Sequence, residues 1–351
     1  MNLLNKRILI VFQPWGWGDY ENSLIFPMVN ELKSIGAEVE VLDLSNPPVF
    51  NKKGFIKKMK NIYWRNIKKN NNYYFFDEIE HYGKFYLNKC RKSIAKKEFD
   101  CTLVIRPDIY SEIFLKYIKK KSKKIMGYMW DGITQNQAQQ LSKIGEIFNN
   151  IFVFDSDDIT KYPNLNLKFG TNFFYDNQLN LDNIYYDSLY IGGIYINRKD
   201  KIVYDFFNKI IEDFKIIIFL DKGFLDDKQL IKDDRVSYIY KHMAYLETLK
   251  YVNKAKCILD ICRPDHKGLS FRFFESLSLN KKIITNNKDV INYDFYNPNN
   301  ILIIEDFEDF NVTEVKQFLN SNYEIIDQKI VDQYSFKNWF LRIFDISKNE
   351  N

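Results

Sequence analysis

The stretch from Lys256 to Asn286, KCILDICRPDHKGLSFRFFESLSLNKKIITN, decides the fold. It predicts a buried strand, a loop that contains Gly268, a short helix and a second strand. A helix N-terminus behind a glycine turn favours anions, because its backbone N–H groups and its dipole both attract negative charge. Arg272 adds a forked donor suited to phosphate, and Glu275, one turn further on, can accept hydrogen bonds from a sugar diol. These residue types suit a nucleoside diphosphate and indicate an enzyme that uses nucleotide sugars.

Strands and helices alternate on both sides of this stretch. In the second half we expect strands at Ser188–Gly192, Lys215–Leu220, Val236–Tyr240, Lys256–Ile261, Lys282–Thr285 and Ile301–Ile304. The helices expected there are Lys201–Phe214, Tyr245–Lys254, Ser270–Leu279, Thr313–Leu319 and Tyr334–Phe344. In the first half we expect strands at Arg7–Phe12, Glu38–Leu44, Cys101–Arg106, Lys124–Trp130 and Ile151–Phe154. The helices expected there are Leu24–Ile35, Phe55–Lys69, Lys84–Lys97 and Tyr110–Lys120.

This alternation builds parallel βαβ units, so the sequence predicts an α/β fold with two facing Rossmann-like domains. Ligands in such sheets bind at the carboxyl ends of the strands, and two facing domains make a cleft. Residues 164–186 are polar and lack periodicity, which predicts a linker. Gly36 and Asn280 follow predicted helices at positions where a left-handed C-cap is needed. We expect the first domain to cover residues 1–175 and the second residues 186–330.

Four segments resemble the GT-B glycosyltransferases, most closely the bacterial lipopolysaccharide- and capsule-type enzymes. They are DSLYIGGIYINRKD (187–200), SYIYKHMAYLETLKYVNKAKCILDI (237–261), GLSFRFFESLSLNKKIITN (268–286) and QYSFKNWFLRIF (333–344). The resemblance covers most of residues 188–345. Over the first half it consists of the architecture and of FVFDSDD at 152–158.

The resemblance implies that the second domain binds a nucleotide-sugar donor and the first an acceptor. It implies that the final helix, in residues 331–351, packs back on the first domain. Gly268, Leu269 and Ser270 would contact phosphate, Arg272 would neutralise the diphosphate leaving group, and Glu275 would hold the ribose. Retaining relatives carry a glutamate eight residues before the position of Glu275, where this chain has Lys267. Retaining or inverting stereochemistry therefore stays open. The resemblance implies no metal, and no cofactor besides the donor itself.

The loop after the first predicted strand, PWGWGDYEN at 14–22, is the main candidate site in the first half. Gly16 and Gly18 allow the backbone to approach a donor closely, and the tryptophans between them offer faces for sugars; a tight turn with core aromatics is the other interpretation. Asp19 is a candidate general base or an N-cap of the next helix. Asp131, in MWDG at another strand end, is an equal candidate for the base.

Two further acidic positions stand at strand ends. Asp260 ends an apolar strand, where a carboxylate needs a partner, so it either touches the ligand or orients the loop. The run at 155–158, DSDD, could hold a metal, but we favour a helix cap there.

Basic residues are unevenly placed in a chain whose formal net charge is +5. One run, at 52–69, lies within a stretch that has no acidic residue, and a second run lies at 116–124. Such runs form solvated faces or contact an anionic membrane, and aromatic residues near the first run suit an interface. Since no nucleic-acid motif is present, we favour contact with the inner membrane surface and expect no nucleic-acid partner.

The cysteine content and the hydropathy pattern limit the cellular compartments in which the protein is expected. The chain of 351 residues has four cysteines, three dispersed histidines and no CxxC pair, which argues against a zinc site or disulfide framework. No apolar run approaches the roughly 20 residues that span a bilayer, and the first residues read as a strand rather than a signal peptide. We expect a cytoplasmic glycosyltransferase, at the membrane surface if the basic runs bind lipid. Two alternatives remain: another GT-B-fold enzyme, such as a nucleotide-sugar epimerase or polyol-phosphate transferase, and a non-catalytic saccharide-binding subunit.

Overall fold

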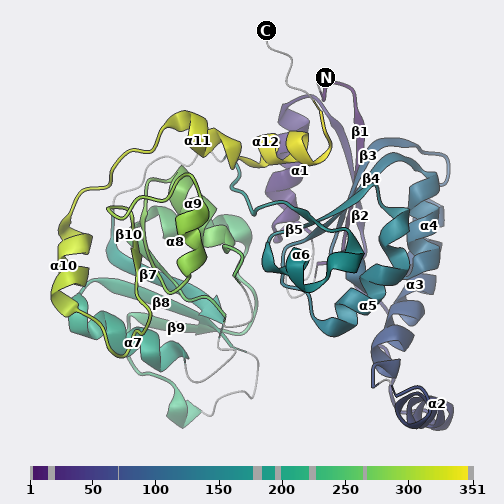
Figure 1. The fold of residues 1–351 in the computed structure, drawn as a ribbon, viewed down its shortest axis with the longest axis horizontal. Helices are drawn as coiled ribbons and strands as arrows, with labels where there is room; N and C mark the ends of the chain where they lie inside the picture. Colours follow the sequence, from purple (N-terminus) through teal and green to yellow (C-terminus); the bar gives the residue numbers. More distant parts are fainter. Residues whose placement is uncertain are drawn as a thin grey trace. The chain divides into compact units, whose positions relative to one another are not determined.

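The computed structural model describes residues 3–14, 20–69, 71–176, 184–193, 199–220, 227–263 and 267–346. The chain divides into two compact units, each with its own sheet (Figure 1). The first unit comprises Met1–Tyr20, Val29–Gly170 and Phe340–Asn351, and the second comprises Glu21–Met28 and Thr171–Trp339.

The first unit contains a six-stranded parallel sheet, in the order β2-β1-β3-β4-β5-β6. Its strands are β1 (Arg7–Phe12), β2 (Glu38–Asp43), β3 (Phe99–Ile105), β4 (Ser122–Met129), β5 (Asn150–Val153) and β6 (Lys168–Phe169). Its helices include α2 (Phe55–Asn66), α3 (Tyr73–Ser93), α4 (Glu112–Lys120), α5 (Gln135–Ile144) and α6 (Asp157–Lys161). Helices α3, α4 and α5 cover the sheet face that carries Leu9 and Val11.

The second unit contains a second parallel sheet of six strands, in the order β12-β11-β10-β7-β8-β9. Its strands are β7 (Tyr186–Gly193), β8 (Phe214–Phe219), β9 (Val236–Ile239), β10 (Ala255–Asp260), β11 (Lys282–Thr285) and β12 (Ile301–Ile303). Helices α7 (Lys199–Ile210) and α10 (Val312–Asn320) cover one face; α8 (Tyr245–Asn253), α9 (Phe271–Ser278) and α11 (Gln328–Gln333) pack on the other.

Two helices pass from one unit to the other. Helix α1 (Ile25–Ser34) begins in the second unit and ends in the first, and α12 (Phe336–Ile343) does the same. The chain after α12 is fastened within the first unit, where Lys124 Nζ donates to the carbonyl of Phe344 at 2.9 Å.

The α/β class with two Rossmann-like sheets is confirmed, and so are both predicted left-handed caps. Gly36 has φ +88° and Asn280 has φ +53°. The helix expected at Lys84–Lys97 instead covers Tyr73–Ser93, because the aromatic residues before it pack as its first turns. Phe214 begins a strand rather than ending a helix.

The region expected to be a plain linker, residues 164–186, is partly built into the fold. It contains β6 as well as Phe173 and Phe174, which are both buried. The sequence did not predict the burial of Phe173 and Phe174, because this region is mostly polar and its apolar residues have neither helical nor strand spacing. Helices α5 and α11 were also not expected.

Two buried lysines fasten the start of β11. Lys281 Nζ donates to the carbonyl of Asn253, at the end of α8, at 2.6 Å. Lys282 Nζ donates to the carbonyls of Phe318 and Ser321 at 2.5 Å and to the Ser321 hydroxyl at 2.6 Å. Burial lowers the pKa of both ammonium groups. Carbonyls at a helix C-terminus attract a cation, so each lysine joins a strand to a neighbouring helix end.

Replacing Lys282 with methionine should therefore destabilise the chain by about 2 kcal/mol, because the carbonyls at the end of α10 lose a charged donor. Urea denaturation measures the change. The matched control is Lys256→Met, which removes an exposed pair with Asp187 and should cost at most about 0.5 kcal/mol. Equal effects of the two substitutions would contradict the assigned role of Lys282.

Candidate functional site

The strand order of the second unit locates one candidate site. From β7, the strands β8 and β9 follow toward one edge of the sheet, and β10, β11 and β12 follow toward the other edge. The strand order therefore reverses between β7 and β10. In open parallel sheets, ligands bind beyond the carboxyl ends of the two strands where the order reverses. Those ends are Gly193 and Asp260, and β10 leads directly to the loop before α9.

Ser270 connects the end of β10 to the start of α9. Its hydroxyl donates to Asp260 Oδ1 at 2.6 Å and accepts the N–H of Arg272 at 3.2 Å. Ser270 is therefore the N-cap of α9, and Asp260 orients the loop, one of the two roles expected for it. Burial raises the pKa of Asp260, and the hydrogen bond from Ser270 opposes that rise.

Two asparagines from other segments of the chain hold the backbone that leads to Ser270. Asn287 Nδ2 donates to the carbonyl of Lys267 at 2.9 Å. Asn172 Nδ2 donates to the carbonyl of Leu269, a buried residue, at 2.9 Å. Gly268, between them, is partly buried. These bonds fix the backbone that precedes the helix N-terminus.

Arg272 and Glu275 form an ion pair one turn into α9, between Nη1 and Oε2. The arginine side chain is 21% exposed and that of the glutamate 1%, so Arg272 is the solvent side of the pair. The other glutamate oxygen, Oε1, is buried and accepts no well-formed hydrogen bond from a described residue, although the Tyr245 hydroxyl lies close enough to interact with the carboxylate. A buried acceptor in that state costs about 1–3 kcal/mol, which marks it as a point where a ligand group could bind.

Tyr245, the first residue of α8, lies beside Glu275. Burial raises the pKa of the Tyr245 phenol well above its usual range, and the negative charge of Glu275 adds to the rise. The Tyr245 backbone N–H donates to the carbonyl of Asn22 at 3.2 Å, and its ring packs against Tyr175. Tyr175 in turn donates its hydroxyl to the carbonyl of Leu24 at 2.5 Å. Residues 22–24 are thus fastened near Glu275, within the second unit.

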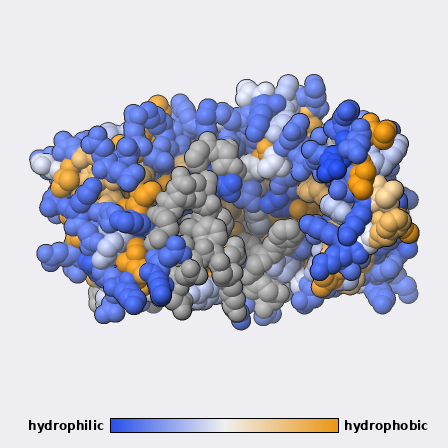
Figure 2. Space-filling model, turned by 90° about the horizontal axis from the view of Figure 1, so that it is seen from below, coloured by the Kyte–Doolittle hydropathy of each residue, from blue (hydrophilic) through white to orange (hydrophobic). Residues whose placement is uncertain are grey.

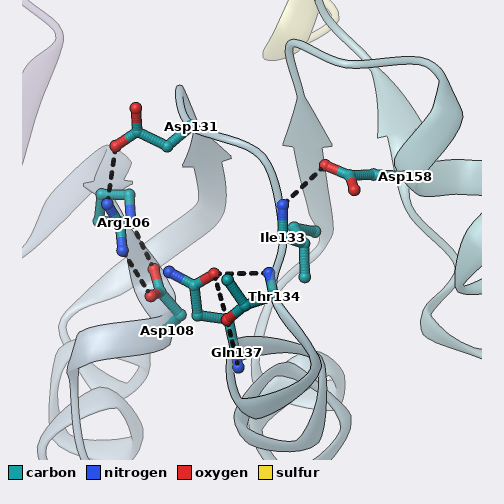
Figure 3. Close-up of polar contacts among 7 residues, drawn as sticks. All are labelled: Arg106, Asp108, Asp131, Ile133, Thr134, Gln137 and Asp158. Carbon is teal, nitrogen blue, oxygen red and sulfur yellow. Dashed lines mark hydrogen bonds and ion pairs between the residues drawn. The ribbon is translucent and has the colours of Figure 1, made fainter. Parts of the chain in front are cut away.

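The strand order of the first unit reverses between β1 and β3. β3 is followed by Arg106, whose φ of +53° is left-handed, an uncommon conformation for arginine. Its guanidinium forms two 2.8 Å hydrogen bonds to Asp108 and one of 2.8 Å to Asp131 (Figure 3). Burial acts to lower the pKa of Arg106, but the two carboxylates outweigh that effect and raise it. The Asp108 side chain is fully buried, whereas that of Asp131 is 58% exposed.

The loop that carries Asp131 is fixed on its other side too, as Figure 3 shows. Asp158 Oδ2 accepts the N–H of Ile133 at 3.1 Å. Thr134 and Gln137 form a capping box at the start of α5, in which Gln137 Oε1 accepts the Thr134 N–H at 2.7 Å. Asp155 Oδ1 accepts the N–H of Asp157 at 3.0 Å in the turn that leads into α6, whose N-cap residue, Ser156, makes no side-chain capping bond; the helix-cap interpretation of DSDD stays a prediction.

The structure brings Asp260, Gly268, Leu269, Ser270, Arg272 and Glu275 together around the start of α9. Asp131 belongs to the first unit, and Gly16, Gly18 and Asp19 lie outside the described residues. In the part of the chain that is described, no three His, Cys, Asp or Glu side chains are grouped so that they could hold a metal ion.

Sequence reasoning missed Arg106 and Tyr245. Arg106 had a usable signal, because it is the first charged residue after the apolar end of a strand, the same position that singled out Asp260. Tyr245 had none, because aromatic residues are frequent in this chain. Thr134 and Gln137 have the capping-box spacing, which could have predicted α5.

Comparisons with solved structures show the same fold. No protein-family model matches the chain, and no curated protein does. An α-glucosyltransferase in complex with UDP and DNA aligns with TM-score 0.55 and 13% identity, over 97% of this chain and 99% of that one. The lipopolysaccharide outer core galactosyltransferase WaaB aligns with TM-score 0.52 and 12% identity, over 97% of this chain and 99% of that one. The chain therefore has the GT-B architecture of these transferases.

Because Asp108 is buried and Asp131 is exposed, removing Arg106 should destabilise the chain more than neutralising Asp131. Arg106→Ala leaves Asp108 buried without a counter-charge and should cost about 3–5 kcal/mol of unfolding free energy. Asp131→Asn breaks a largely exposed pair and should cost at most about 1 kcal/mol. Chemical denaturation measures both values. If Asp131→Asn destabilised the chain as much as Arg106→Ala, Asp131 would be a structural residue and not a candidate base.

Asp158 predicts a pH dependence of stability. Burial raises its pKa to about 6, above the value near 3.9 of an unfolded chain. Between about pH 4 and pH 6 the folded chain therefore binds a proton that the unfolded chain lacks, so this contribution to stability is lost as the pH rises. Asp158→Asn can still accept the Ile133 N–H. It should flatten the profile in that window and be on the order of 2 kcal/mol more stable than wild type at pH 7.

Denaturant titrations at a series of pH values test this prediction. The control is Asp205→Asn, which changes an exposed carboxylate of α7 and should keep the wild-type profile. An Asp158→Asn profile as steep as that of wild type would contradict the assignment.

Proposed function

We propose that the chain is a glycosyltransferase that moves a sugar from a nucleotide-sugar donor to a saccharide or lipid-linked acceptor. The observation that carries the proposal is the Arg272–Glu275 pair at the start of α9, with the buried oxygen of Glu275 left unsatisfied. It lies next to the strand reversal, where a parallel sheet of this order binds nucleotides.

The pair can separate when a donor binds. The Arg272 fork suits two phosphate oxygens, and a diphosphate near the α9 N-terminus would draw the guanidinium away from Glu275. The freed carboxylate would then accept both hydroxyls of a ribose, which restores its hydrogen bonds. Gly268, Leu269 and Ser270 would contact the phosphates. The Ser270 hydroxyl caps the helix and donates to Asp260, so it holds the backbone of these residues in place.

The same groups would promote the reaction. As the glycosidic bond breaks, charge develops on the leaving diphosphate, where the helix N-terminus and Arg272 stabilise it without requiring a metal ion. If the reaction inverts, a carboxylate of the first unit, Asp19 or Asp131, would accept the proton of the acceptor hydroxyl. The Arg106 contact fixes one oxygen of Asp131 and leaves most of the side chain exposed, which suits that role. Gly16 and Gly18 would let their loop approach the donor.

The donor and acceptor classes follow by analogy. Solved structures with the same fold were obtained with UDP and with UDP-glucose, so a uridine nucleotide sugar is the first donor to assay. The similarity to the lipopolysaccharide galactosyltransferase and the resemblance of the sequence favour an acceptor in lipopolysaccharide or capsule synthesis, in the cytoplasm or at the inner membrane. In the described residues, no helix is long and apolar enough to cross a membrane.

A donor-hydrolysis and transfer assay with a panel of nucleotide sugars tests the proposal. Arg272→Lys keeps a charge beside Glu275 and loses the fork, so kcat/KM should fall on the order of tenfold; Arg272→Ala should lower it about a hundredfold. Glu275→Gln should weaken donor binding about tenfold. The matched control is Arg235→Lys, in an ion pair with Asp233 elsewhere in the second unit, which should leave kcat/KM unchanged.

Product analysis and calorimetry separate the alternatives. Epimerised donor formed without acceptor would identify an epimerase, and transfer of a polyol phosphate would identify the other enzyme class. A folded chain that binds no donor in calorimetry would be the non-catalytic subunit. Unchanged donor affinity and turnover in all three variants at Arg272 and Glu275 would refute the site.

A further inference from the structure

Helix α2 presents an unpartnered apolar face to solvent. Figure 2 views the molecule from the side where α2 lies in Figure 1 and shows hydrophobic residues among hydrophilic ones at that end. None of the α2 residues is buried. Five of its six large apolar residues, all but Trp64, are 43–80% exposed, whereas the neighbouring α3 buries Tyr73, Phe76 and Ile79. The five exposed residues are Phe55, Ile56, Met59, Ile62 and Tyr63.

The back of α2 is fixed on α3, which determines the face that points outward. Lys57 forms a 2.9 Å ion pair with Asp77, and the Trp64 ring lies 5.8 Å from that of Tyr73. Lys57, Asn61 and Trp64 are the partly buried positions of the helix, at the spacing of one helical face. At about 100° per residue, the opposite face is the one that carries Phe55, Met59 and Ile62. We call this face, with Ile56 and Tyr63, the apolar stripe.

Basic residues border the apolar stripe on both sides. By the same helical angle, Lys58 and Arg65 lie along one edge and Lys60 along the other. The flanking chain adds Lys52, Lys53, Lys68 and Lys69. None of these seven side chains is in an ion pair with a described residue, and no acidic residue occurs between Leu44 and Phe76. An exposed apolar stripe between rows of free cations is the pattern of helices that lie in the plane of an anionic membrane.

The second basic run differs, because five of its six lysines, all but the exposed Lys120, have partners within the first unit. Lys116 pairs with Glu112 and Lys123 with Asp100. Lys119, Lys121 and Lys124 donate to Asn149, to the Ala95 carbonyl and to the Phe344 carbonyl. This run therefore serves the fold, and the structure separates two runs that looked alike in the sequence.

We propose that α2 is a membrane-docking helix that inserts its apolar stripe into the headgroup region of an anionic bilayer, while Lys58, Lys60 and Arg65 contact lipid phosphates. The occupant is a lipid surface and not a protein groove, because free positive charge surrounds the stripe on both edges. The inference adds to the proposed function a surface for reaching lipid-linked acceptors, but it does not depend on that function. Vesicle binding is measured without a donor, so either idea can fail alone.

Vesicle flotation with the full chain tests the docking helix. The wild-type chain should bind vesicles of phosphatidylcholine and phosphatidylglycerol in equal parts, bind pure phosphatidylcholine far more weakly, and lose binding in high salt. Phe55→Ser with Ile62→Ser should lower vesicle affinity at least tenfold. Lys58→Glu with Arg65→Glu should also lower it at least tenfold, because each basic residue near anionic lipid contributes roughly fivefold.

Matched controls change exposed residues of the second unit. Ile325→Ser and Lys316→Glu should leave vesicle affinity unchanged, and unaltered circular dichroism should show that every variant is folded. Equal binding to neutral and anionic vesicles would overturn the proposal, as would α2 variants that bind like wild type. Salt-sensitive binding to duplex DNA with no binding to vesicles would also overturn it and would assign α2 to nucleic acid.

Discussion

The parallel pairing of β7 with β10 is the constraint on which the candidate site depends. β7 also pairs with β8, so the strand order reverses between β7 and β10, and in sheets of this kind ligands bind beyond the carboxyl ends of those two strands. Because β10 ends at Asp260, the chain must turn at the edge of the sheet, where the Asp260–Ser270 hydrogen bond starts α9. Arg272 and Glu275 are three residues apart in this helix, so helical geometry places their side chains next to each other.

Electrostatics give the two units different kinds of site. In the second unit a single arginine, at the solvent side of a buried glutamate, balances one charge and leaves a carboxylate oxygen unsatisfied. That arrangement can open, because a phosphate can replace the carboxylate as the partner of the arginine. In the first unit Arg106 holds two carboxylates, one of them fully buried, and its backbone is left-handed. That arrangement is fixed, and it positions the exposed Asp131.

Much of the fold could be predicted from the sequence, because buried parallel strands are short apolar runs that end at charged or turn residues. The left-handed conformations of Asn280 and Gly36 were predictable, because each residue directly follows a predicted helix and both residue types tolerate a positive φ. The contacts of Phe173 and Phe174 were not, since their burial depends on tertiary packing and leaves no periodic pattern. The site around α9 was predictable in its residues but not in its arrangement: the Asp260–Ser270 bond and the place of Tyr245 beside Glu275 join segments far apart in sequence. The two basic runs look alike in composition, and only their partners distinguish α2 from the lysines that fasten the first unit.

The central claim is that the Arg272–Glu275 pair opens to take a nucleoside diphosphate. A crystal structure of the chain with bound UDP tests it most directly. We expect the diphosphate to lie at the N-terminus of α9, with the Arg272 guanidinium donating to two phosphate oxygens and Glu275 accepting the ribose hydroxyls. A diphosphate bound elsewhere, or bound there with the Arg272–Glu275 pair unbroken and the ribose away from Glu275, would contradict it.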